Sequence, residues 1–230
     1  IISKNFSKLE INHSNPKEDS IRLISSFDHN YILLINGKLI KSDLKFEDKK
    51  MVSINNYHDK IFSEKKSQNP LICLNNALSN NGYFIEVKNN YKFEKLLVIY
   101  NLFTGDLSNK ILNNKNKIIL GDNSELHTFE YTINRSKNKF LVNSYENSLL
   151  AENSIHKNIS IQAGSNNGYF HKYGENILKS NSSYSSFIFS SGPKFLKQDL
   201  KFDLIGQNAE CNIRSALYLN ENDHQEIKTR

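Results

Sequence analysis

The clearest pattern in the second half of the chain is a series of short segments in which apolar and polar side chains alternate. In one of them Leu196, Leu200, Phe202 and Leu204 fall on one face, and charged residues stand between them. A period of two residues is typical of a strand with one buried face. After about residue 94 the sequence predicts nine strands and no long helix: Leu96–Leu102, Lys117–Leu120, Glu125–Ile133, Phe140–Leu150, Ile155–Gln162, Tyr169–Tyr173, Tyr184–Ser190, Phe195–Leu204 and Glu210–Leu219.

Glycine and asparagine stand at the turns between these strands. Examples are Gly121-Asp122-Asn123 and the segment 164–168. Both residue types accept a positive φ at low steric cost, which tight turns require. Many short strands joined by small turns fit a sandwich, a barrel or a β-helix, and strand propensity alone does not choose among them.

The first 93 residues have a mixed pattern. Residues 1–30 are polar, with a helix start indicated at Asp19-Ser20, and we expect them to be helical and peripheral. Asn36-Gly37 predicts a hairpin turn, and Ser79 to Gly82 a helix end. We therefore predict a mixed α/β region over 1–93 and a β-rich core over 94–230. In the first region we expect strands over Tyr31–Ile35, Lys38–Ile40 and Tyr83–Val87, and a helix over Leu71–Leu78.

Composition narrows the class of protein. Hydrophobic residues make up 38% of the chain and the mean hydropathy is −0.57, and no apolar run approaches the roughly 20 residues of a membrane-spanning helix, so we predict no membrane partner. The 30 Lys and Arg are mixed with 24 Asp and Glu, so no basic stripe predicts nucleic-acid binding.

The two cysteines lack the spacing of a metal motif and fit a reducing compartment. Because the chain begins at Ile1 without Met, we expect a piece of a longer protein.

Motifs of common catalytic sites are missing from the sequence. There is no Gly-x-Ser-x-Gly elbow, no phosphate-binding Gly-Lys-Ser/Thr loop and no His-Glu-x-x-His helix. The acidic pairs Glu125 with Glu130 and Asp199 with Asp203 could line a groove, as glycosidases require. Solvated strand faces explain them more simply, and we expect any ATP hydrolysis to come from a partner.

The last third of the chain carries a longer motif. A basic residue and an Asp precede a strand, a Leu-x-Gly turn leads to Ala-Glu-Cys, and a Leu-Tyr-Leu strand runs into a segment with His and Thr. The positions are Lys197, Asp199, Leu204, Gly206, Ala209, Glu210, Cys211, Leu217, Tyr218, Leu219, His224 and Thr229. In this the chain resembles the SufB/SufD family of the SUF iron–sulfur cluster assembly system, and its SufD branch more closely than SufB.

The resemblance has departures and consequences. Lys197 stands where Arg is usual, Ala216 where Gly is common, and Asp223 and Glu226 flank His224 in place of Gln and Asp. The resemblance implies a mainly β fold, a right-handed parallel β-helix, truncated at its C-terminal end. It also implies a cytoplasmic or plastid-stromal setting and a complex with SufB and the ATPase SufC.

Two residues are the candidate metal ligands under this resemblance. A thiolate such as that of Cys211 binds soft metals, although a lone cysteine in an apolar strand usually packs as a small hydrophobe. His224 lies among carboxylates, which could orient a ligand nitrogen, although a surface or turn histidine that supports an interface with SufB is the simpler interpretation. We expect Cys73 to pack in the core, and we predict no joint metal site for His127, His156 and His171.

Three functions compete at this point. The first is a SufD-like, non-catalytic scaffold that pairs with SufB and acts with SufC. On this hypothesis the chain alone binds no cofactor, and an iron–sulfur cluster belongs to the complex. The second is a β-helical protein that binds or cleaves polysaccharide, and the third a basic nucleic-acid binder, whose affinity would fall steeply with salt.

Overall fold

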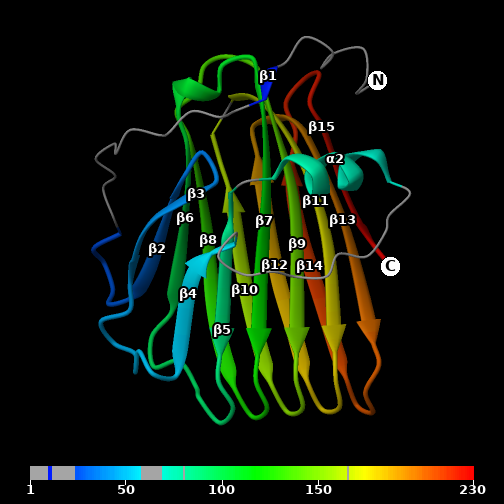
Figure 1. Cartoon of the computed structure of the whole chain (residues 1–230). Coiled ribbons are helices and arrows are strands. Elements are labelled where there is room, and N and C mark those ends of the chain that lie inside the picture. Colours follow the sequence, from blue (N-terminus) through cyan, green and yellow to red (C-terminus); the bar gives the residue numbers. More distant parts are fainter. Residues whose placement is uncertain (1–9, 12–23, 58–68, 80, 165) are drawn as a thin grey trace.

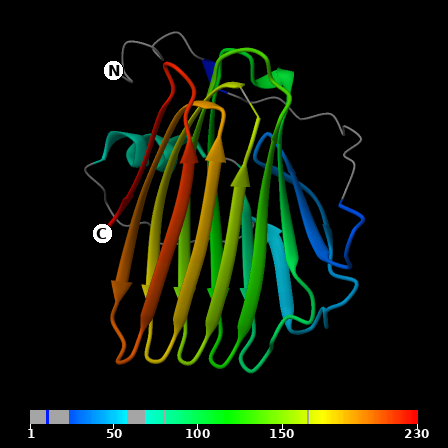
Figure 2. The same cartoon turned by 180° about the vertical axis from the view of Figure 1, so that it is seen from behind.

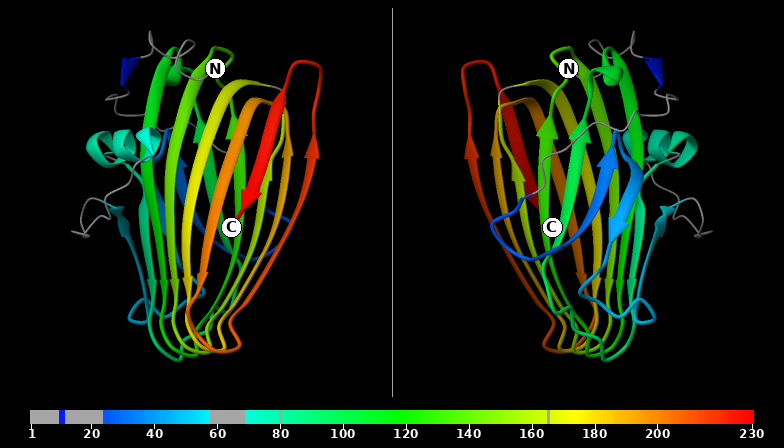
Figure 3. Two further views of the ribbon diagram at one scale, coloured as in Figure 1. Left: turned by 90° about the vertical axis from the view of Figure 1, so that its right-hand side faces the viewer. Right: turned by 90° about the vertical axis from the view of Figure 1, so that its left-hand side faces the viewer.

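The computed structural model of the chain describes residues 10–11, 24–57, 69–79, 81–164 and 166–230. Two sheets face each other, and from β5 onward the chain passes from one sheet to the other at every turn, which makes a parallel β-solenoid (Figure 1). Seen from their edges in Figure 3, the sheets converge at the lower turns and separate toward the upper loops. The predicted β-helix is therefore confirmed, and the sandwich and the closed barrel are not formed.

From β5 onward each sheet collects alternate strands of the chain. The seven-stranded sheet, in front in Figure 2, has the order β14-β12-β10-β8-β6-β2-β3. Its strands are β2 (Asn30–Ile35), β3 (Lys38–Asp43), β6 (Leu97–Phe103), β8 (Glu125–Asn134), β10 (Ile155–Gln162), β12 (Ser183–Ser191) and β14 (Glu210–Tyr218).

The eight-stranded sheet has the order β15-β13-β11-β9-β7-β5-β4, with β1 added beside β7. Its strands are β1 (Glu10–Ile11), β4 (Val52–Asn56), β5 (Tyr83–Val87), β7 (Lys110–Leu120), β9 (Phe140–Leu150), β11 (Asn166–Leu178), β13 (Pro193–Leu204) and β15 (His224–Thr229). Pairing is parallel except in β2–β3 and β4–β5. The helix α2 (Pro70–Leu78) packs on the outer face of β7 and β9, and the short 3₁₀ helix η2 (Gly105–Leu107) precedes β7.

The lower turns share one construction, built on an asparagine with positive φ. Asn123, Asn153, Asn181 and Asn208 have φ near 55°, a region that asparagine tolerates better than most residues. The side-chain amide of Asn153 donates to Oδ1 of Asn123 at 3.0 Å, and that of Asn208 to Oδ1 of Asn181 at 3.1 Å. The backbone N–H groups of Asn123, Asn153 and Asn181 each donate to a carbonyl of the next turn, so hydrogen bonds join all successive lower turns.

The interior is layered from the lower turns upward. A large apolar cluster lies at the lower end, with Leu120, Leu150 and Leu178 fully buried. A second cluster at the upper end contains Phe103, Phe140 and other aromatic and aliphatic side chains. Between them the inward side chains are polar, and the candidate site lies in this layer.

Several expectations for individual segments change. Within 1–30 the described residues form β1, the start of β2 and irregular backbone, and the predicted helix start at Asp19-Ser20 lies outside the described residues. β4 and β15 were not predicted, and β7 and β11 are longer than predicted. Strands on both sides of residue 93 belong to the same two sheets, and the boundary at 93/94 stays a prediction.

Candidate functional site in the polar interior

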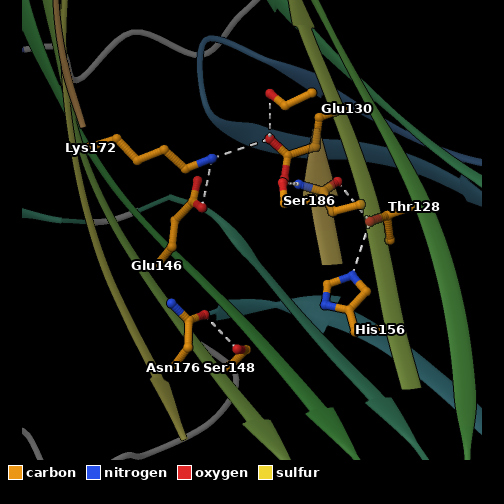
Figure 4. A network of polar contacts seen from close by, with 10 residues as sticks. Thr128, Glu130, Glu146, Ser148, His156, Lys172, Asn176 and Ser186 are labelled. Atoms are coloured by element: carbon orange, nitrogen blue, oxygen red, sulfur yellow. Dashed lines mark hydrogen bonds and ion pairs between the residues drawn. The ribbon is translucent and has the colours of Figure 1, made fainter. Parts of the chain in front are cut away.

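The centre of the polar layer is a lysine between two glutamates that come from different sheets. Lys172 of β11 places Nζ 2.7 Å from Oε2 of Glu146 on β9 and 3.2 Å from Oε2 of Glu130 on β8 (Figure 4). The exposed fractions of these three side chains are 17%, 25% and 13%. The alternation of β8, β9 and β11 directs all three inward, so the ion pairs join the facing sheets.

Burial and charge shift the pKa values of Glu146 and Lys172 in opposite directions. Burial raises the pKa of Glu146, and Lys172 opposes that rise. Burial alone would lower the pKa of Lys172, but attraction by Glu130 and Glu146 outweighs it and holds the pKa above its ordinary value. Lys172 therefore stays charged, while Glu146 is the group that could take up a proton.

Below the triad the polar layer continues through hydrogen bonds across the rungs. The hydroxyl of Thr128 lies 3.0 Å from Nε2 of His156 and donates to Oδ1 of Asn158 at 2.9 Å. Ser148 donates to Oδ1 of Asn176 at 2.6 Å. Burial lowers the pKa of His156 to about 3, with a smaller contribution from His127, so its imidazole is neutral at neutral pH.

Two small cavities adjoin these side chains. One of about 30 Å³ is lined by His156, Tyr184 and Glu146 among others, and one of about 70 Å³ by Lys172 and Gln198 among others; Glu130 and Glu146 line both. The buried Nδ1 of His156 has no protein partner. Polar cavities of this size hold water, so the interior can bind water beside Glu130, Glu146 and Lys172.

The structure does not bring the two predicted metal ligands together. Cys211 follows the lower turn before β14, and His224 begins β15 after the upper loop. Cys211 is half-buried beside the apolar core, and burial raises the pKa of its thiol to about 11. His224 is exposed on the other sheet and stacks on Phe195, with ring centroids 5.2 Å apart. Within the described ranges no three His, Cys, Asp or Glu side chains form a group that could hold a metal.

The remaining histidines lie in different environments. His127 faces outward and is 2.8 Å from Glu125. His156 faces the interior, and His171 lies under helix α2 with Nδ1 3.0 Å from Oδ1 of Asn143. They do not converge on one site.

The prediction for Cys73 was wrong. Helix α2 buries Ile72 and Asn75, and Cys73 points away from the sheet and is exposed. Asn75 donates to the carbonyl oxygens of Asn114 at 3.0 Å and Asn143 at 2.7 Å. Polar contacts of the helix with the sheet backbone, rather than the apolar run alone, decide which face is buried.

Sequence reasoning missed the polar interior altogether. In these strands the inward positions carry polar residues, as the outward positions do. Examples on β9 are Ser144, Glu146 and Ser148. Such a pattern resembles a solvated strand unless the rung repeat is recognised. That repeat is visible as Leu-x-x-Asn-Ser at 120–124, 150–154 and 178–182.

Comparison with known proteins identifies a family whose model matches the second half of the chain. A family model described as "SUF system FeS cluster assembly, SufBD core domain" matches residues 103–230, which is 128 of the 230 residues and more than half of the chain. The match begins at the end of β6 and covers every later rung. No curated protein matches the chain. Among the described residues no helix is long and apolar enough to cross a membrane.

Proposed function

The chain belongs to the SufBD core family of the SUF iron–sulfur cluster assembly system, and on that basis we propose that it is a SufD-like scaffold subunit. The observation that carries the proposal is the family match over 103–230, which coincides with the regular rungs of the solenoid. Ala209-Glu210-Cys211 and Leu217-Tyr218-Leu219, in and around β14, support the SufD branch over SufB.

We propose SufB and the ATPase SufC as the partners, in the cytoplasm or in a plastid stroma. The role is non-catalytic, with the nascent cluster as cargo. The polysaccharide alternative is not favoured, because Glu125 bonds to His127 on the outer face of β8 whereas Glu130 pairs with Lys172 inside. The second acidic pair is also engaged, Asp199 with Arg230 at 3.0 Å and Asp203 with Lys201 at 2.8 Å.

Of the two ligand candidates, we propose His224 rather than Cys211 for a cluster assembled in the complex. The imidazole of His224 is exposed and stacks on Phe195 of the neighbouring strand. The half-buried thiol of Cys211, with its raised pKa, stays protonated at neutral pH, and a metal ligand must be the thiolate.

The experiment is co-expression of the complete natural protein with SufB and SufC, followed by affinity purification and iron and sulfide analysis. We expect a three-component complex that carries a cluster. His224→Ala should lower cluster content without releasing the partners, while His127→Ala and Cys211→Ser should leave it unchanged. Failure to co-purify with either partner would contradict the scaffold role, and full cluster content in His224→Ala would remove only the ligand assignment.

A further inference from the structure

At the first rung of the solenoid, each of the two sheets ends in a strand that has one open edge. β3 is the terminal strand of the seven-stranded sheet, and β4 is the terminal strand of the eight-stranded sheet at the same end. Both run antiparallel to their only strand partners in the described part of the chain, β2 and β5. Open strand edges are sites where another backbone can pair.

The pairing of β4 with β5 shows which backbone groups are directed outward. The carbonyl of Met51 accepts from the amide of Lys88, and the amide of Tyr57 donates to the carbonyl of Gly82. In an antiparallel pair, hydrogen-bonded and non-bonded residues alternate. The odd-numbered residues of β4 therefore bond to β5, and the N–H and C=O groups of Val52 and Ile54 point to the open edge.

A groove of about 350 Å³ runs along this edge. On one side it is lined by Val52, Ser53, Ile54 and Asn55 of β4, and on the other by Ser42, Asp43, Leu44 and Lys49. Val52 and Leu44 are buried and apolar, and Ser53 Oγ is a buried hydroxyl without a hydrogen-bond partner. The groove thus combines unused backbone groups, an apolar side and a polar side.

We propose that this groove binds an extended peptide segment of a partner protein, which adds to β4 as a further strand. Backbone pairing with Val52 and Ile54 supplies the affinity, as in other cases of strand addition. Because side chains alternate along a strand, the segment presents apolar residues toward Val52 and Ile54 and hydrogen-bonding residues toward Ser53 and Asn55. Asp43 and Lys49 provide opposite charges near the ends of the segment.

The opposite wall argues for a single strand as the occupant. Ser42, Asp43 and Leu44 line the groove together with β4, so one extended segment along β4 can contact both sets of residues. A helix cannot use the open backbone groups of β4, since its own are already paired. This inference concerns the first rung and does not depend on the proposed pairing with SufB.

The test uses the 230-residue chain and a fluorescent heptapeptide of alternating valine and serine with lysine at one end and glutamate at the other. We expect saturable binding by fluorescence anisotropy, with slower amide exchange at Val52 and Ile54. The same peptide with N-methylated valines should not bind, because it cannot pair with a strand edge; the protein is unchanged, so misfolding cannot cause the loss. Ser53→Ala should weaken binding, and Ser185→Ala, on the outer face of β12, should not.

Three results would overturn the proposal. One is equal binding of the N-methylated peptide, which would show that backbone pairing is not involved. Another is protection at β14 or β15 in place of β4. The third is concentration-dependent self-association that slows exchange at β4 without peptide, which would assign the edge to a second copy of the chain.

Discussion

At the scale of single residues, the side chain with the largest expected effect on the stability of the interior is a lysine inside the solenoid. Lys172 neutralises two inward carboxylates, Glu130 and Glu146, that approach it from the two sheets. Without it, two mostly buried carboxylates would share one site, and a buried charge without a partner is far more costly than a paired one.

Replacing Lys172 by Met tests this account. We expect Lys172→Met to lower the free energy of unfolding by about 3 kcal/mol, since it leaves two mostly buried carboxylates unpaired. Urea denaturation at pH 7 measures the change. The triple variant Lys172→Met, Glu130→Gln, Glu146→Gln should recover most of the loss, because it removes the charges together. If the triple variant is as unstable as the single one, the cost comes from packing rather than charge.

His156 makes stability depend on pH in a defined window. Its pKa in the fold is about 3 against an ordinary 6.5, so below pH 6.5 the unfolded chain binds a proton that the folded chain does not. Stability from this group is complete above pH 6.5 and is lost as the pH falls toward 3. Between pH 6.5 and 5 the loss is about 2 kcal/mol.

Urea unfolding of the natural chain, His156→Gln and His224→Gln at pH 7 and pH 5 tests this pH dependence of stability. We expect His156→Gln to be less stable at pH 7, because the Thr128 contact is altered, but to lose about 2 kcal/mol less on acidification. The exposed His224 serves as the control and should keep the natural pH response. An unchanged response in His156→Gln would mean that other groups dominate this window.

At the scale of elements, the lower turn is the unit that repeats. Asn153 has a φ of 56° and bonds to the side chain of Asn123. Substitution can separate these two contributions, because glycine retains the backbone conformation and alanine does not.

We expect Asn153→Ala to be about 1 kcal/mol less stable than Asn153→Gly, which itself loses only the side-chain hydrogen bonds. Urea denaturation of the two variants beside the natural chain measures both contributions. Equal losses in the two variants would show that the side-chain hydrogen bonds, and not the φ angle, account for the preference for asparagine.

The elements also show what sequence patterns could and could not predict. Strands such as β9 and β10 were predicted with their full bounds, because alternation and β-propensity agree there. β7 was predicted only from Lys117, since Asn113 to Asn116 gives no hydrophobic signal although all four residues are buried. Their burial depends on partners in neighbouring rungs and under helix α2, which a single segment of sequence does not reveal.

The polar interior was beyond prediction for the same reason. Serines, asparagines and a lysine are stable inside the protein only when hydrogen bonds cross from one rung to the next, as from Thr128 to Asn158. The motif of the last third predicted the family and the fold. It did not predict that Cys211 and His224 lie on different sheets, because that depends on where the upper and lower turns fall.

At the scale of the whole molecule, burial declines along the solenoid. Strands β6 and β9 are largely buried, whereas in β14 the exposed and half-buried residues alternate and none is buried. In a solenoid each rung is stabilised mainly by its neighbours, so in a chain of these 230 residues β14 and β15 are expected to open most readily.

Hydrogen exchange measures this gradient. We expect amides of β14 and β15 to exchange with protection at least about tenfold lower than those of β8 and β9, because opening of the last rung leaves the others paired. Uniform protection along the chain would mean that the rungs open together.

The two ends of each rung differ in how much variation in chain length they accept. After the first lower connection, 88–96, the lower connections have four residues at 121–124, 151–154 and 179–182 and five at 205–209. The upper ones range from the single residue 192 to the six residues 104–109. Hydrogen bonds tie the lower connections together and one extra residue is accommodated at 205–209, so an insertion of several residues there would displace the neighbouring turns. New peptide sequence, whether a purification tag or a natural insertion, should therefore be accommodated at the upper rim and rejected at the lower one.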